Sequence, residues 1–195
     1  MKKLLSLIGS FGFSILPLTN IFPIISCSIQ NPIVKELSYA DGKSNKDVLN
    51  FLLNPEIKLA DSFKDSVLEL PLQITDDNKL AKDYLNIYDE KIVDDNITYE
   101  IQGIEGNQVI LDSIFEGNSF PTELIEIFPE LEDLKSNIDF FKYSGTTHLL
   151  SLKGYKGSSN FTLFIYEVNL SLKKKGLYET RKTTNRKLYK IDVEI

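Results

Sequence analysis

The sequence predicts an α+β domain: short helices in the N-terminal two thirds pack on an antiparallel sheet, and a C-terminal β-meander completes that sheet. Two observations support this fold class. In the first two thirds, apolar residues recur every three or four positions, as on one face of a helix, with short strand-like runs between. Near the C-terminus they alternate with polar residues, and the connections are too short for parallel crossovers. Helices and strands segregated along the chain are typical of α+β proteins.

The first predicted helix begins at a capping-box pattern. Asp47 follows Ser44 by three positions, and apolar residues come directly after it, up to Leu52. The helix is expected to end at Asn54-Pro55, because proline disfavours helical backbone in the residue before it.

Two further helices are predicted. Asp76-Asp77 can cap a helix, and its apolar face would be formed by Leu80, Tyr84, Ile87 and Tyr88. Between residues 121 and 143, apolar positions again recur every three or four residues. Pro129 is expected to divide this segment into a short turn and a longer helix, because an interior proline costs a helix about 3 kcal/mol.

Strands are predicted where apolar and polar residues alternate. Pro71 places the strand at Leu68–Ile74 on a sheet edge, since proline cannot donate to a ladder. Glu105-Gly106-Asn107 is expected to join two strands as a hairpin. The strands and turns of the C-terminal meander are expected at residues 147–153, 161–172 and 189–195, with turns at 157–160 and 175–176.

The first 26 residues have the layout of a secretory signal peptide. They begin with a basic pair, Lys2-Lys3, contain no acidic residue, and are otherwise rich in Leu, Ile and Phe. The alternative is a retained membrane anchor. Pro17, Pro23 and the polar pair Thr19-Asn20 argue against it, because a helix in lipid would lose backbone hydrogen bonds and bury polar groups there.

The run Ile24-Ile25-Ser26-Cys27 resembles a bacterial lipobox, with a branched aliphatic residue first, a small residue before the cysteine and a polar Ser28 after it. The resemblance implies that diacylglycerol is attached to the Cys27 sulfur and that cleavage makes Cys27 the first residue. Ile24, Ile25 and Ser26 would then be recognised by the processing enzymes. More than one acyl chain is needed for stable anchoring, because a single chain binds membranes reversibly. No cofactor beyond this covalent diacylglycerol is expected.

The leader is also similar to those of surface lipoproteins from mollicutes, the wall-less bacteria, and especially the spiralin-bearing ones. Lys far outnumbers Arg, Ile and Asn are abundant, and Ala is rare, as expected for an AT-rich genome. The resemblance covers about the first thirty residues, and no family is identified for the remainder. The sequence therefore predicts a signal peptide over residues 1–26, a lipidated flexible tether over 27–45 and a single globular domain over 46–195.

Composition narrows the classes of function. A mature chain of this length forms one domain with a substantial core. With its only cysteine lipidated, the protein would have neither a disulfide nor a cysteine-based metal site. The net charge of −6 argues against nucleic acid as a partner. No glycine-rich nucleotide-binding motif or calcium-binding loop occurs.

Basic residues are concentrated after residue 172, where they would line the last hairpin. They form a candidate contact for an anionic surface, either lipid headgroups or an acidic host polymer. The alternative is that these lysines protect sheet edges from pairing with other chains. The candidate residues are Lys173, Lys174, Lys175, Arg181, Lys182, Arg186 and Lys187, with Lys190 beyond them.

His148, the only histidine, shares strand parity with Leu150 and Leu152 and is therefore expected on the apolar face, buried and neutral. Ser144 and Ser151 near it lack the context of a nucleophilic serine, so no catalytic residue and no metal ligand is assigned. The predicted function is a membrane-anchored surface lipoprotein that binds a host or surface protein or a glycan, or forms part of a surface coat. The alternatives are a small ligand-binding accessory of a transporter, which a single deep pocket lined by Tyr and Phe would favour, and a hydrolase using His148.

Overall fold

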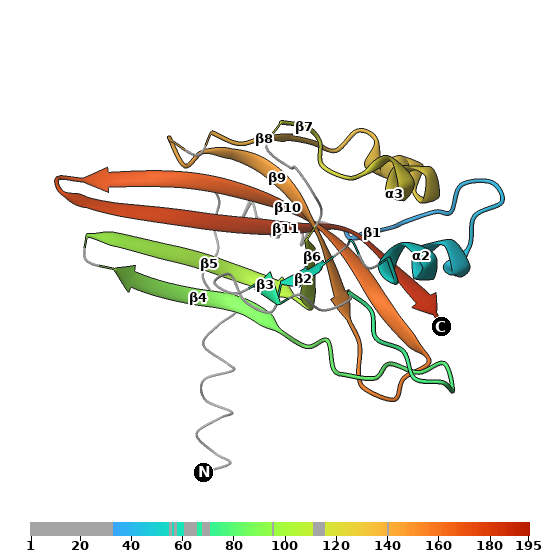
Figure 1. Cartoon of the computed structure of the whole chain (residues 1–195). Coiled ribbons are helices and arrows are strands. Elements are labelled where there is room, and N and C mark those ends of the chain that lie inside the picture. Colours follow the sequence, from blue (N-terminus) through green and yellow to red (C-terminus); the bar gives the residue numbers. More distant parts are fainter. Residues whose placement is uncertain are drawn as a thin grey trace, which may run out of the picture. The chain divides into compact units, whose positions relative to one another are not determined.

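The computed structural model describes residues 33–54, 56, 58–60, 66–67, 71–94, 96–110, 116–139 and 141–195. One large sheet dominates, with strand order β3-β2-β6-β9-β10-β11-β5-β4 and with β1 paired to β11 (Figure 1). Its strands are β1 (Lys35–Glu36), β2 (Lys58–Ala60), β3 (Ser66–Val67), β4 (Ile87–Asp94), β5 (Ile97–Glu105), β6 (Asn107–Ile110), β9 (Gly145–Lys153), β10 (Asn160–Lys175) and β11 (Tyr178–Glu194). A separate small sheet pairs β7 (Glu116–Asn118) with β8 (Lys135–Asn137).

The fold is α+β in coarse terms, with strands predominating, and the sheet is mixed. β9, β10 and β11 form the predicted antiparallel meander. However, β11 runs parallel to both β5 and β1, so the prediction of a purely antiparallel sheet is wrong. Both parallel pairings join segments far apart in the sequence, and local alternation carries no information about such partners.

The last hairpin is longer than the predicted strands, with 16 residues in β10 and 17 in β11. Gly176 occupies the first central position of its two-residue turn with φ of 65°, which suits a type II′ turn. A bulge lies opposite Ile165 and Tyr166 and increases the local twist. Figure 1 shows this hairpin and the β4–β5 hairpin extending beside each other on the left of the view.

The helix predicted after Asp76-Asp77 is absent from the described residues, which form a turn followed by β4. Thr75 is bonded locally in this turn: its N–H donates to the Lys79 carbonyl at 2.9 Å, and its hydroxyl donates to Asp77 at 2.6 Å. Asp77 thus bonds to a turn side chain instead of capping a helix. Of the strand predicted at 68–74, residues 68–70 lie outside the described residues, and Ile74 forms only an isolated bridge with Leu80.

The segment from 121 to 143 contains far less helix than predicted. α3 (Thr122–Ile127) is followed by a single 3-10 turn, η1 (Pro129–Leu131), and then by β8. Pro129 divides the segment as predicted, but a helix, α3, lies before it where a turn was predicted, and the longer helix predicted after it is wrong.

The hairpin predicted at 105–107 is also wrong, although both of its strands exist. β5 pairs with β4 and β11, whereas β6 pairs with β2 and β9. The chain turns sharply between them at Gly106, whose φ is 85°. Ile101 and Ile104 of β5 share a small buried cluster with Phe164 and Tyr166 of β10, so this part of β5 crosses one face of the sheet.

The main core brings the helices and the sheet residues into one buried cluster. α2 (Asn45–Leu52) begins at the predicted capping box, in which the Ser44 N–H donates to the Asp47 carboxylate at 2.9 Å. The cluster includes Val48, Phe51, Leu52, Leu72, Leu80, Tyr84, Leu124, Phe128, Leu131, Leu150, Leu152, Leu163, Ile165 and Val193.

Residues 33–45, predicted as part of the flexible tether, lie against the domain instead. β1 pairs with β11, the Leu37 side chain is buried in the main core, and the Tyr39 ring stacks on Phe128 with centroids 5.3 Å apart. These residues belong to the compact unit that extends from Pro32 to Ile195, which begins 14 residues before the predicted boundary at residue 46. Within the described part of the chain, no helix has the length and apolar content needed to cross a membrane.

Candidate functional site

His148 lies at the end of a buried chain of hydroxyl groups. Its Nδ1 is 2.8 Å from the Ser119 Oγ, which is 2.8 Å from the Ser136 Oγ, and Ser136 is in turn 2.9 Å from the Thr147 Oγ1. Ser119 directly follows β7, and Ser136 belongs to β8, so the small sheet supplies the partners. The Phe120 ring lies 6.4 Å from the imidazole.

This arrangement resembles a Ser–His pair, but its burial prevents contact with a substrate. His148 is 4% exposed and Ser119 is 1% exposed, whereas a nucleophilic serine must reach a substrate carbonyl. The Ser151 hydroxyl, near His148 in sequence, donates instead to the carbonyl of Glu105. The expectation that His148 is a buried histidine bonded to a neighbour is confirmed, and its hydroxyl partner comes from a segment that sequence proximity did not indicate.

Burial lowers the pKa of His148 below its ordinary value of 6.5, and the nearby Glu167 carboxylate partly opposes this shift. In the unfolded chain, His148 therefore takes up a proton near pH 6.5, whereas in the folded chain it takes up a proton only at lower pH. Folding stability should consequently fall as pH drops below 6.5, by at most about 1.4 kcal/mol per pH unit from this group. We expect His148→Asn to remove that component, as measured by urea unfolding between pH 7.5 and about pH 5. Parallel loss of stability in the variant and the wild type would contradict this prediction.

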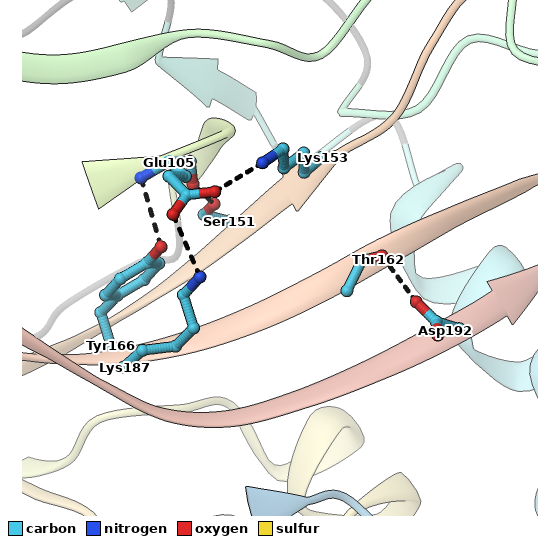
Figure 2. Close-up of polar contacts among 7 residues, drawn as sticks. All are labelled: Glu105, Ser151, Lys153, Thr162, Tyr166, Lys187 and Asp192. Atoms are coloured by element: carbon cyan, nitrogen blue, oxygen red, sulfur yellow. Dashed lines mark hydrogen bonds and ion pairs between the residues drawn. The ribbon is translucent and has the colours of Figure 1, made fainter. Parts of the chain in front are cut away.

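A second polar cluster joins four strands at the carboxylate of Glu105. Figure 2 shows that Lys153 and Lys187 each contact a different oxygen of this carboxylate. The Lys153 Nζ donates to Oε2 at 2.5 Å, and the Lys187 Nζ donates to Oε1 at 3.3 Å. The Glu105 N–H also donates to the Tyr166 hydroxyl at 3.2 Å. The same view shows a separate pair on the β10–β11 ladder, in which Thr162 donates to Asp192 at 2.6 Å.

The electrostatics of the Glu105 cluster favour a structural role. The hydrogen bond from Lys153 lowers the pKa of Glu105, with a further contribution from Lys187, so the carboxylate is ionised at neutral pH. Burial raises the pKa of Tyr166 to about 12. Lys187 also lies 3.8 Å from the Phe164 ring centroid, a cation–π distance. Neither Glu105 nor Tyr166 is therefore suited to exchange protons near pH 7, and the contacts of the cluster tie β5 to β9, β10 and β11.

The seven predicted basic residues lie on the β10–β11 hairpin, and four of them are neutralised by carboxylates. Glu179 accepts from Lys174 at 2.7 Å and lies 3.6 Å from Arg181. The other two pairs are Arg186–Glu167 at 2.9 Å and Lys187–Glu105 at 3.3 Å. Lys190, beyond the patch, lies 3.3 Å from Glu36.

Arg181 is further enclosed by aromatic rings. Its guanidinium lies 5.4 Å from the ring centroids of both Tyr99 and Tyr143, and it donates to the Tyr99 hydroxyl at 3.2 Å. The Tyr143 hydroxyl is also 3.1 Å from Thr183. Arg181 therefore stabilises the β10–β11 hairpin and is poorly placed to meet an external anion. Three predicted residues remain without an ion pair to any described residue: Lys173, Lys175 and Lys182.

Several surface depressions occur in the described part of the chain. One of about 290 Å³ is lined by Ile33, Lys35, Glu167 and Arg186 among others. Another, of about 300 Å³, lies beside Tyr155, Phe161 and Phe164. Both are open to solvent, unlike the deep aromatic pocket that would indicate a transport receptor. Among the described residues, no group of three or more His, Cys, Asp or Glu side chains could hold a metal ion.

The predicted lipidation site, Cys27, and the recognition positions Ile24, Ile25 and Ser26 lie outside the described residues. Comparisons with protein-family models, with curated proteins and with solved structures found no match to this chain.

Proposed function

We propose that this protein is a bacterial surface lipoprotein, anchored to the outer face of the cell membrane by diacylglycerol on Cys27, whose domain acts by binding. Its partner would be a host or surface protein or a glycan, or neighbouring molecules of a surface coat. The observation that carries this proposal is the lipobox-like run Ile24-Ile25-Ser26-Cys27, placed directly after a basic start and an apolar stretch.

The short connection between this motif and the folded domain supports the proposal. Only five residues separate Cys27 from Ile33, where the described domain begins, so the domain would lie close to the bilayer. A sheet fastened by partly buried ion pairs and an extensive core suits a binding role, in which a rigid surface is presented to a partner. The helices of the domain, α2 and α3, would pack on one face of the sheet.

Replacing Cys27 by Ser tests the anchor directly. In a bacterium that processes lipoproteins, we expect the wild type to enter the detergent phase after detergent partitioning and the Cys27→Ser variant to stay in the aqueous phase or to keep its leader. Two acyl chains give stable membrane attachment, and the variant has no sulfur to receive them. Equal partitioning of both proteins, with the leader retained in both, would show that Cys27 is incidental and that the apolar start is a membrane anchor.

The hydrolase alternative has its own test. If His148→Ala left the fold intact, by circular dichroism and urea unfolding, yet abolished a hydrolytic activity of the wild type, the binding proposal would fail. Because His148 is enclosed by Ser119 and Phe120, we expect this substitution to lower stability and to change no hydrolytic rate above background.

A further inference from the structure

The β10–β11 hairpin has two faces of different charge. Residues that pair across neighbouring strands project from the same face of a sheet. Lys175 pairs with Tyr178, Lys173 with Thr180, and Ser171 with Lys182. The three lysines that lack an ion pair to a described residue therefore share one face, which we call the lysine face and define by Lys173, Lys175 and Lys182.

The lysine face continues onto the β4–β5 hairpin. Lys182 pairs with Glu100, which pairs with Lys91; the Lys91 and Glu100 side chains lie 3.3 Å apart, which confirms that they are on the same side. Together these side chains carry four positive charges and one negative charge. On the opposite face, at the same position along the hairpin, lie Lys174, Arg181 and Glu179. The Glu179 carboxylate is paired with both of these cations. The excess positive charge thus lies on the lysine face.

Exposed apolar side chains stand at the tip of the same hairpin. Leu177 is 84% exposed and Tyr178 is 65% exposed. Tyr178 projects from the lysine face because it pairs with Lys175. Val93 is also exposed. It pairs with Thr98, and Thr98 pairs with Thr180, so the Val93 side chain also lies on the lysine face. Tyrosine and leucine flanked by lysines suit a membrane interface, where rings sit among headgroups and lysines reach anionic lipids.

The described domain begins on the side of β1 that is nearer to the hairpin turn. β1 runs parallel to β11, so Ile33 and Val34, which directly precede β1, lie on that side. Ile33 lines the same depression as Leu188 of β11. The ten residues of β11 from Leu188 back to Tyr178 span about 33 Å. The six peptide links from Cys27 to Ile33 extend at most about 20 Å. A bilayer holding the lipid is therefore within reach of the tip when the hairpin is inclined toward it.

We infer that the lysine face and the tip residues Leu177-Tyr178 dock onto the anionic headgroup surface of the bilayer that holds the lipid anchor. This second attachment rests on the proposed lipidation of Cys27, and it fixes the orientation of the domain. Anionic lipid is favoured over a protein partner because the excess positive charge and the exposed tip residues lie at the same end of the β10–β11 hairpin, and because only five residues separate Cys27 from the described domain.

A single tryptophan at the tip tests this inference, because the chain contains no tryptophan. The lipidated Tyr178→Trp protein is reconstituted in phosphatidylcholine vesicles, with and without phosphatidylglycerol, that contain a brominated lipid. We expect a blue-shifted emission and strong quenching only with phosphatidylglycerol, and reversal of both at about 1 M salt, where the Debye length is about 3 Å. Tyr155→Trp is the matched control, since Tyr155 is an exposed tyrosine in the turn at the other end of β10.

The charge requirement is tested in the same Tyr178→Trp protein. Replacing Lys173, Lys175 and Lys182 by Gln should abolish the quenching, because each lysine removed lowers affinity for an anionic surface about fivefold. The control removes the same charge from exposed lysines elsewhere, Lys46, Lys135 and Lys156, and should leave the quenching unchanged.

Three results would overturn the inference. One is a Tyr178→Trp protein that is attached to anionic vesicles but whose tryptophan emits at the wavelength of a solvent-exposed indole. The second is equal quenching on neutral vesicles. The third is an emission shift that depends on the surface density of the protein and not on phosphatidylglycerol, which would identify a second copy of the chain as the partner. The intact mass of each sample distinguishes failure of this inference from failure of the proposed function. A protein without acyl mass would show that the lipid anchor is missing, whereas a protein with acyl mass that gives one of these three results would show that only the docking is wrong.

Discussion

Gly106→Ala should lower the free energy of unfolding by roughly 2–5 kcal/mol, the sum of left-handed backbone strain and a steric collision. Gly106 has φ of 85°, which residues with a side chain adopt at a cost. A Cβ at this position would lie 2.2 Å from the Leu152 carbonyl oxygen and 2.7 Å from the Ser151 Oγ. The collision is with backbone, so relief requires β6 to move away from β9. Urea unfolding followed by circular dichroism measures this loss.

Gly42→Ala is the matched control for this substitution. Gly42 has a similar φ of 77°, but no atom lies within 4 Å of the position of its Cβ. It should therefore show the backbone cost alone, about 1 kcal/mol. Equal losses at both glycines would mean that the turn at Gly106 is not held tightly against β9, and that β5 does not cross the sheet as described.

Leu52→Ala should cost about 2–5 kcal/mol, because truncating a buried leucine loses transfer free energy and leaves a cavity. Leu52 is the last residue of α2 and is 0% exposed, within the same buried cluster as Leu150 and Leu163 of the sheet. The loss would be measured as a lower midpoint of urea unfolding with an unchanged slope. The prediction also tests whether α2 packs on the sheet.

The adjacent leucine provides the control. Leu53 is 38% exposed, so Leu53→Ala should change stability by no more than about 0.5 kcal/mol. If both substitutions had the same small effect, α2 would not contribute to the main core, and the domain would begin later in the chain than β1.

The meander could be predicted from sequence because its strands are long, adjacent in the chain and separated by glycine-containing turns at Gly157 and Gly176. The helix predicted after Asp77 failed for a different reason. Ile87 and Tyr88 fit both a helical face and a strand when only a few positions are counted, and the period alone does not separate the two. The pairing of β4 with β5, which decides the matter, lies later in the chain.

The basic residues of the candidate surface could be predicted from the sequence, but which of them are paired with carboxylates could not. The pairing of Glu179 with Lys174 could be predicted from the sequence, because a two-residue turn at Gly176-Leu177 places these two residues opposite each other. Glu105, by contrast, is 82 residues from Lys187, and no local pattern joins them. The sequence therefore indicated where positive charge accumulates, while the register of the strands decides which lysines remain without a partner.

The most direct test of the central claim is the intact mass of the mature protein recovered from membranes of a bacterium that processes lipoproteins. We expect a chain that begins at Cys27, has lost residues 1–26, and carries the added mass of at least one diacylglycerol, whereas the Cys27→Ser variant should show no such mass. A wild-type chain that still begins at Met1, without acyl mass, would contradict the proposed lipidation of Cys27, and the membrane-facing hairpin that depends on this anchor would lose its basis.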